Sequence, residues 1–134
     1  MSRVQLALRV GDLEAAVDFY RRLFDAAPAK RRPGYANFAI AEPPLKLVLL
    51  EGKAGSPTAL DHLGVEVMST DDVGAAAERL AESGLETRVE DTTECCYALQ
   101  DKEWVSDPGG APWEVYTVLA DASARSGSTG CCGS

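Results

Sequence analysis

The stretch that decides the fold is "VQLALRVGDLEAAVDFYRRL" (residues 4–23), because the chain repeats its pattern as "DHLGVEVMSTDDVGAAAERL" (residues 61–80). Each copy opens with alternating apolar residues, and this alternation predicts a β-strand. An aspartate followed by an apolar residue comes next, at Asp12 and again at Asp72, and predicts the start of a helix. The repeat therefore predicts two modules that both begin with a strand and a helix.

Strand-like segments also follow each predicted helix. They are residues 27–33, 35–41 and 45–51 in the first half, and 85–92, 102–108 and 112–119 in the second. The order βαβββ therefore occurs twice, which predicts an α+β fold. We expect a single domain over residues 1–119, with modules of about 1–52 and 60–119, and a flexible cysteine-containing tail over residues 120–134.

The composition narrows the class of protein. The chain has 134 residues, of which 46% are hydrophobic and 25% charged, as is usual for one globular domain. Its net charge of -8 argues against binding to nucleic acid and to anionic membranes. The opening "MSRVQLALRV" lacks the apolar core of a signal peptide, and no stretch is apolar enough to span a membrane. We therefore expect a cytoplasmic protein whose thiols stay reduced.

Three side chains are candidates for a metal site. His62, the only histidine, occupies the same place in the second copy of the repeat that Gln5 occupies in the first, so both should face the same side of their strands. Glu114 lies among apolar residues in the last strand, where a carboxylate is costly unless it is paired or binds a metal. Taken singly, each also fits an ordinary role: a hydrogen-bonded core histidine, an edge amide and an outward-facing charge.

Two pairs of adjacent cysteines stand out, Cys95–Cys96 and Cys131–Cys132. Neighbouring Cα atoms lie about 3.8 Å apart, which is too close for an unstrained disulfide. Structural zinc sites usually space their thiols by a few residues. Two adjacent thiolates better suit one soft, thiophilic atom. The alternative is that the cysteines are merely small apolar residues. Residues 91–104, "DTTECCYALQDKEW", lack clean alternation and predict a loop that lets the thiols converge.

The βαβββ repeat resembles the vicinal oxygen chelate superfamily of glyoxalases, extradiol dioxygenases and bleomycin resistance proteins. This resemblance implies curled mixed sheets that enclose a divalent metal, with Gln5, His62 and Glu114 as its ligands. Gln5 departs from the histidine that is common at its position. Glu51 is the only candidate for a fourth ligand in its strand, and we favour three ligands, which leave coordination positions open.

With Cys95 and Cys96, the chain is similar to the ArsI-type carbon–arsenic lyases of that superfamily and to the related cadmium-induced proteins. The resemblance implies cleavage of the carbon–arsenic bond of trivalent organoarsenicals, such as methylarsenite and aromatic arsenicals, to give arsenite. It also implies Fe(II) as cofactor, replaceable by Ni, Co or Mn, and dioxygen as co-substrate. Cys95 and Cys96 would then hold the substrate.

Other residues are candidates for the surroundings of the substrate, and two other functions are open. Tyr97, Lys102 and Trp104 are candidates for the substrate pocket, and Cys131 and Cys132 for accessory thiols. A homodimer is expected from the resemblance. One alternative function is a non-catalytic protein that binds soft metals or arsenicals. Another is a different metal-dependent enzyme of the superfamily, such as a thiol transferase or a glyoxalase.

Overall fold

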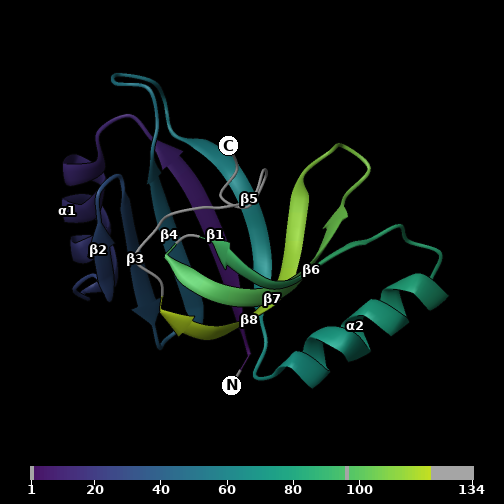
Figure 1. Cartoon of the computed structure of the whole chain (residues 1–134). Helices are drawn as coiled ribbons and strands as arrows, with labels where there is room; N and C mark the ends of the chain where they lie inside the picture. Colours follow the sequence, from purple (N-terminus) through teal and green to yellow (C-terminus); the bar gives the residue numbers. More distant parts are fainter. Residues whose placement is uncertain (1, 96, 122–134) are drawn as a thin grey trace. The chain divides into compact units, whose positions relative to one another are not determined.

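The structure is a computed structural model that describes residues 2–95 and 97–121. The chain divides into two compact units, which are described separately (Figure 1). The first unit is Val4–Asp61, and the second joins the N-terminal residues through Arg3 to the chain from His62 onward.

The first unit contains one helix and a mixed sheet. Its elements are β1 (Arg3–Val10), α1 (Leu13–Phe24), β2 (Lys30–Arg32), β3 (Tyr35–Ile40) and β4 (Leu45–Glu51). The strands lie in the order β2-β3-β4-β1, and β1 runs parallel to β4 while the other pairs are antiparallel. Helix α1 packs against β3 and β4 (Figure 1), and the core between them is built on buried residues such as Val17, Phe38 and Leu47.

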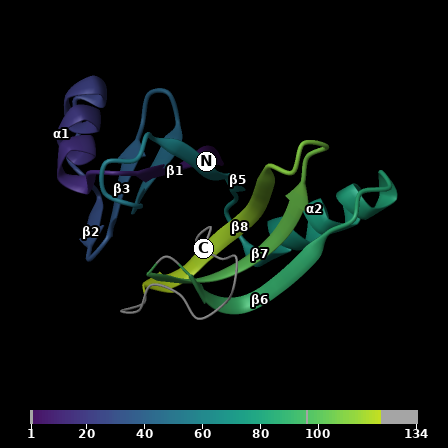
Figure 2. The same cartoon turned by 90° about the horizontal axis from the view of Figure 1, so that it is seen from above.

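The second unit repeats this arrangement. Its elements are β5 (Ala59–Glu66), α2 (Thr70–Glu82), β6 (Arg88–Cys95), β7 (Ala98–Ser106) and β8 (Pro112–Asp121). The strands lie in the order β5-β8-β7-β6, with β5 parallel to β8. Helix α2 packs against β7 and β8 (Figure 2). The predicted α+β fold with two βαβββ modules is confirmed.

The two helices begin differently. In α1, Asp12 is the N-cap, and its side chain accepts a hydrogen bond from the backbone N–H of Ala15 at 3.0 Å, as the sequence predicted. In α2, the N-cap is Ser69, whose hydroxyl accepts a hydrogen bond from the backbone N–H of Asp72 at 3.2 Å. The predicted start at Asp72 was therefore wrong, because a serine three residues earlier takes the capping role.

The prediction of a loop over residues 91–104 was also wrong. Residues 91–104 are not a loop, because β6 continues to Cys95 and β7 begins at Ala98. The two strands pair antiparallel, with Cys95 opposite Ala98, and Tyr97 adopts a left-handed backbone with φ of 63°. The lack of clean alternation has another cause, a shift of register between Glu90 and Thr93. A bulge of this kind moves later side chains to the other face of the strand and so conceals the strand pattern.

None of the helices in the described residues is long and apolar enough to cross a membrane.

Candidate metal and substrate site

The centre of the second unit is a cluster of three buried polar side chains. His62 comes from β5, Glu114 from β8 and Lys102 from β7. They are exposed by only 2%, 3% and 0%. In the sheet, Glu114 lies opposite Trp104 on β7 and beside Gly64 on β5. Because side chains alternate along a strand, these register positions bring all three polar groups to one face.

Glu114 contacts both of the other groups. Its Oε2 lies 2.7 Å from Nε2 of His62, and its Oε1 lies 2.7 Å from Nζ of Lys102. Burial alone would raise the pKa of Glu114, but the charge of Lys102 and the hydrogen bond and charge of His62 lower the pKa to about 2. The carboxyl group is therefore ionised at neutral pH in spite of its burial.

Aromatic rings surround this cluster. The rings of His62 and Trp104 meet edge to face with their centroids 5.5 Å apart. The Lys102 ammonium lies 5.4 Å from the centroid of Trp104 and 5.9 Å from that of Tyr116. The indole N–H of Trp104 donates to Glu90 at 2.7 Å, which fixes the ring. Trp104 is thus in direct contact with one candidate metal ligand.

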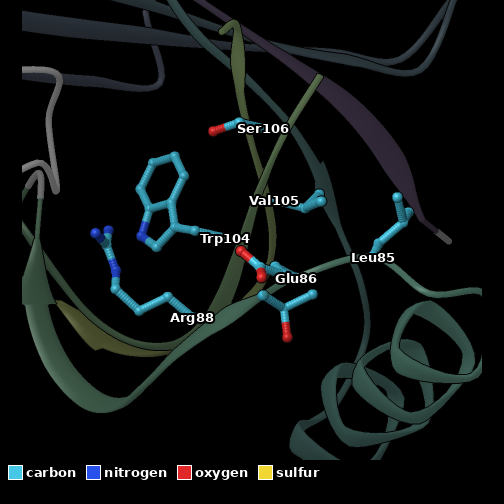
Figure 3. Close-up of a pocket in the computed structure, with 7 residues that line it drawn as sticks. Leu85, Glu86, Arg88, Trp104, Val105 and Ser106 are labelled. Atoms are coloured by element: carbon cyan, nitrogen blue, oxygen red, sulfur yellow. The ribbon is translucent and has the colours of Figure 1, made fainter. Parts of the chain in front are cut away.

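Trp104 also borders a surface hollow of about 390 Å³ near the end of β7 (Figure 3). Arg88 lies beside the indole ring, with its guanidinium carbon 5.9 Å from the ring centroid. Val105 and Ser106 line the same hollow. Trp104 thus contacts His62 and also lines the hollow, and its role in a substrate pocket stays a prediction.

The donor types suit a divalent metal. An imidazole and an ionised carboxylate are ligands that Fe, Mn, Co and Ni accept. Within residues 2–95 and 97–121, no group of three His, Cys, Asp or Glu side chains could hold a metal ion. The role of Gln5 as a ligand stays a prediction. Gln5 lies on β1 of the first unit and is buried, whereas Glu51 ends β4 and is exposed.

The cysteine predictions fall in part outside the structure. Cys95 is the last residue of β6. Tyr97, two positions further along the chain, has a buried side chain. Cys96, Cys131 and Cys132 lie outside the described residues. The substrate-binding role of Cys95 and Cys96 therefore stays a prediction.

Two features of the cluster were missed from the sequence. Lys102 was expected in the substrate pocket, but its contact with Glu114 was not foreseen. Tyr116 was not singled out, although it is buried and its hydroxyl donates to Glu66 at 3.0 Å. The sequence does place both Lys102 and Tyr116 in predicted strands. That the two residues stand opposite each other follows only from the register of β7 with β8.

Comparison with known proteins decides the family. The sequence profile of the Glyoxalase/Bleomycin resistance protein/Dioxygenase superfamily matches residues 3–115. The chain belongs to this superfamily. It is 64% identical over 134 residues to the "Trivalent organoarsenical cleaving enzyme" of Thermomonospora curvata, over 98% of this chain and 89% of that protein. It is also 66% identical over 122 residues to the "Cadmium-induced protein CadI" of Mycobacterium tuberculosis, over 91% of this chain and 80% of that protein. Within the superfamily it therefore belongs to the group that contains these two proteins, as the cysteine pair predicted.

Solved structures of the superfamily share the fold. The Mn(II)-bound glyoxalase of Novosphingobium aromaticivorans matches with a TM-score of 0.63 and 20% identity, over 96% of this chain and 44% of that one. An extradiol ring-cleaving dioxygenase of B. fuscum matches with a TM-score of 0.62 and 22% identity, over 90% of this chain and 33% of that one. At this identity the likeness establishes the vicinal oxygen chelate fold alone.

Proposed function

We propose that this protein cleaves the carbon–arsenic bond of trivalent organoarsenicals, with Fe(II) and dioxygen, and releases arsenite. The observation that carries the proposal is the buried contact of His62 with Glu114, in a chain that is 64% identical to a protein named as a trivalent organoarsenical cleaving enzyme. The contact supplies two ligand types that iron accepts, and the relative supplies the class of reaction.

The metal would be held by His62 and Glu114, with the amide of Gln5 as third ligand. Fe(II) at such a site would activate dioxygen, because three protein ligands leave open positions. The chain itself prepares the site in two ways. Lys102 and His62 keep Glu114 ionised, and so ready to bind a cation. Trp104 packs against the His62 ring, which holds the imidazole in one orientation.

The substrate would be held by Cys95 and Cys96. A trivalent arsenic atom that carries one organic group has two remaining valences, and two thiolates can fill both with loss of two hydroxide or water ligands. Each thiol loses its proton when its sulfur binds the arsenic, since the thiolate is the ligand form. The organic group then stays free to approach the metal, with Tyr97, Lys102 and Trp104 as candidates to surround it.

A second function has its own support. The chain is 66% identical to a protein named as cadmium-induced, and cadmium, like arsenic, prefers thiolate ligands. A non-catalytic protein that binds soft metals through its cysteine pairs is therefore the main alternative. It shares the thiol chemistry with the first proposal and differs from it in needing neither iron nor dioxygen.

One experiment separates the two functions. The reduced protein is loaded with Fe(II) without oxygen, methylarsenite is added, and half of the sample is exposed to air before its arsenic species are separated and measured. Arsenite that forms only with both iron and air supports the enzyme. His62→Ala should give none while it still binds methylarsenite. Methylarsenite that is bound but recovered unchanged under every condition would establish the binding protein instead.

A further inference from the structure

The strand that leads to the cysteine pair contains one extra residue. The first part of β6 pairs with β7 in a regular antiparallel register. Its pairs are Arg88 with Trp104, Val89 with Glu103, and Glu90 with Lys102. The register shifts between Glu90 and Thr93. After the shift the pairs are Thr93 with Gln100, Glu94 with Leu99, and Cys95 with Ala98. Residues 91 and 92 therefore stand opposite the single residue Asp101, which defines a β-bulge.

Asp101 holds this bulge from the neighbouring strand. Its side chain is buried, and its Oδ1 accepts a hydrogen bond from the backbone N–H of Thr92 at 2.6 Å. Its Oδ2 accepts a second hydrogen bond from the hydroxyl of Thr70, the first residue of α2, at 2.6 Å. One carboxylate thus joins the bulge to the start of the helix. Hydrogen bonds to an ionised group are among the strong ones in proteins.

The bulge needs such support because its backbone is strained. Thr92 has a φ of 49°, in the left-handed region that β-branched residues rarely adopt. Glycine would adopt this conformation without strain, but the chain has threonine here. The hydrogen bond from Thr92 to Asp101 therefore offsets an unfavourable backbone conformation.

The extra residue decides which position of β6 meets Ala98. If the register of Arg88–Glu90 continued unchanged, Glu94 would stand opposite Ala98 and Cys95 would fall beyond the paired strand. The bulge instead brings Cys95 opposite Ala98. Ala98 belongs to the same alternating row of β7 as Lys102 and Trp104, the residues that surround Glu114. A slip of one residue exchanges the rows of a strand.

We propose that Asp101 is a positioning residue for Cys95, one of the two proposed substrate thiols: it stabilises the β6 bulge and so sets Cys95, rather than Glu94, opposite Ala98 of β7. This inference rests on the proposed function, because the binding of arsenic by Cys95 and Cys96 is part of that proposal. Asp101 does not touch substrate or metal in this account. It acts through the backbone of Thr92.

The competing explanation is that Asp101 only attaches α2 to the sheet through Thr70. The two explanations predict different effects on arsenical binding. Thr70→Val removes the link to the helix and leaves the bond to Thr92 in place. Asp101→Ala removes both bonds. Adding Thr92→Gly to Asp101→Ala relieves the backbone strain but cannot restore the link to the helix.

The test measures equilibrium binding of methylarsenite to the reduced, metal-free full-length protein by dialysis and arsenic analysis, with thermal unfolding recorded in parallel. We expect Asp101→Ala to raise the Kd by about tenfold, as the loss of a buried hydrogen bond to a charged group suggests. The double variant with Thr92→Gly should return close to the wild-type Kd. Thr70→Val should lower the unfolding temperature and leave the Kd unchanged.

Each result has a definite meaning. Normal binding by Asp101→Ala, or weak binding by the folded double variant, overturns the inference. If Asp101→Ala alone does not fold, the double variant carries the test, and its failure to fold or to bind also overturns the inference. Cys95→Ser separates this inference from the proposed function. If Cys95→Ser loses binding while the Asp101 variants keep it, only the role of Asp101 is wrong. If Cys95→Ser binds normally, both proposals are wrong.

Discussion

Lys102 and Glu114 form a buried ion pair across β7 and β8, with Nζ 2.7 Å from Oε1 and both side chains almost fully buried. In the register, Lys102 stands opposite Tyr116 and Glu114 opposite Trp104, so the pair meets along a diagonal of the two strands. Long side chains can span such a diagonal. The pair keeps the carboxylate charged although it is buried, and a charged carboxylate is the form that binds a metal cation.

Lys102→Met should strongly destabilise the metal-free protein. The substitution keeps much of the side-chain volume but leaves Glu114 without its ammonium partner, and breaking a buried pair in this way costs about 3–5 kcal/mol. Chemical denaturation in the presence of a chelator measures the change. The matched control is Lys53→Met, an exposed lysine outside the site, which should change the free energy of unfolding by less than about 0.5 kcal/mol. Equal effects of the two substitutions would contradict the proposed importance of the pair.

Gln5→His should strengthen metal binding. An imidazole is a better donor to first-row divalent metals than a neutral amide oxygen. We expect the Kd for Co(II), measured by anaerobic titration calorimetry, to fall by about tenfold or more, as an added strong ligand implies. His62→Ala provides the opposite reference, with binding lost. An unchanged Co(II) affinity in Gln5→His would show that Gln5 is not a ligand.

Cys95 and Cys96 should act as a unit. One thiolate cannot hold trivalent arsenic against exchange with other thiols, so we expect Cys96→Ser to abolish turnover of methylarsenite almost as completely as the double substitution. The comparison is a chain truncated after Asp121, the last residue of β8, which removes Cys131 and Cys132. Truncation should leave turnover at saturating substrate nearly unchanged. The reverse result, with turnover lost only on truncation, would identify the second pair as the substrate thiols.

The contribution of Asp101 to stability should depend on pH. The hydroxyl of Thr70 and the backbone N–H of Thr92 lower the pKa of this carboxyl group in the folded protein. Its stabilisation is therefore complete above the ordinary pKa of about 3.9 and is lost as the pH falls through the lower folded pKa. The difference in free energy of unfolding between the wild type and Asp101→Asn should be largest near pH 6 and shrink below about pH 4.

Denaturation at several pH values measures this difference. Glu78→Gln, on the exposed side of α2, controls for the loss of one negative charge. A difference between wild type and Asp101→Asn that stays constant from pH 6 to pH 3 would contradict the role of the ionised carboxylate.

Much of the fold could be predicted because its signals are local. Alternation around Gln5 and His62 predicted β1 and β5, and the repeat predicted that the two modules share one order of elements. The N-cap of α1 was predicted correctly, because Asp12 is the only capping side chain directly before that helix. The start of α2 was missed because Ser69, Thr70, Asp71 and Asp72 are all capping residues and local sequence does not rank them.

The candidate site was only partly predictable. His62 and Glu114 were chosen from the sequence, and the structure brings their side chains within 2.7 Å. Their relation to Lys102 depends on the pairing of β7 with β8, and that pairing contains its own shift between Leu99 and Gln100. A shift of one residue changes which side chains share a face, and residue types alone do not reveal it.

The sequence by itself determined most of the strands and helices, the duplicated βαβββ order and the candidate ligand types, because alternation and repetition depend on residues that are neighbours in the chain. Only the tertiary structure decided that Lys102 pairs with Glu114 and that Asp101 supports the bulge before Cys95. Both contacts join different strands, and the register between strands is fixed by packing, turns and bulges rather than by the identity of either partner.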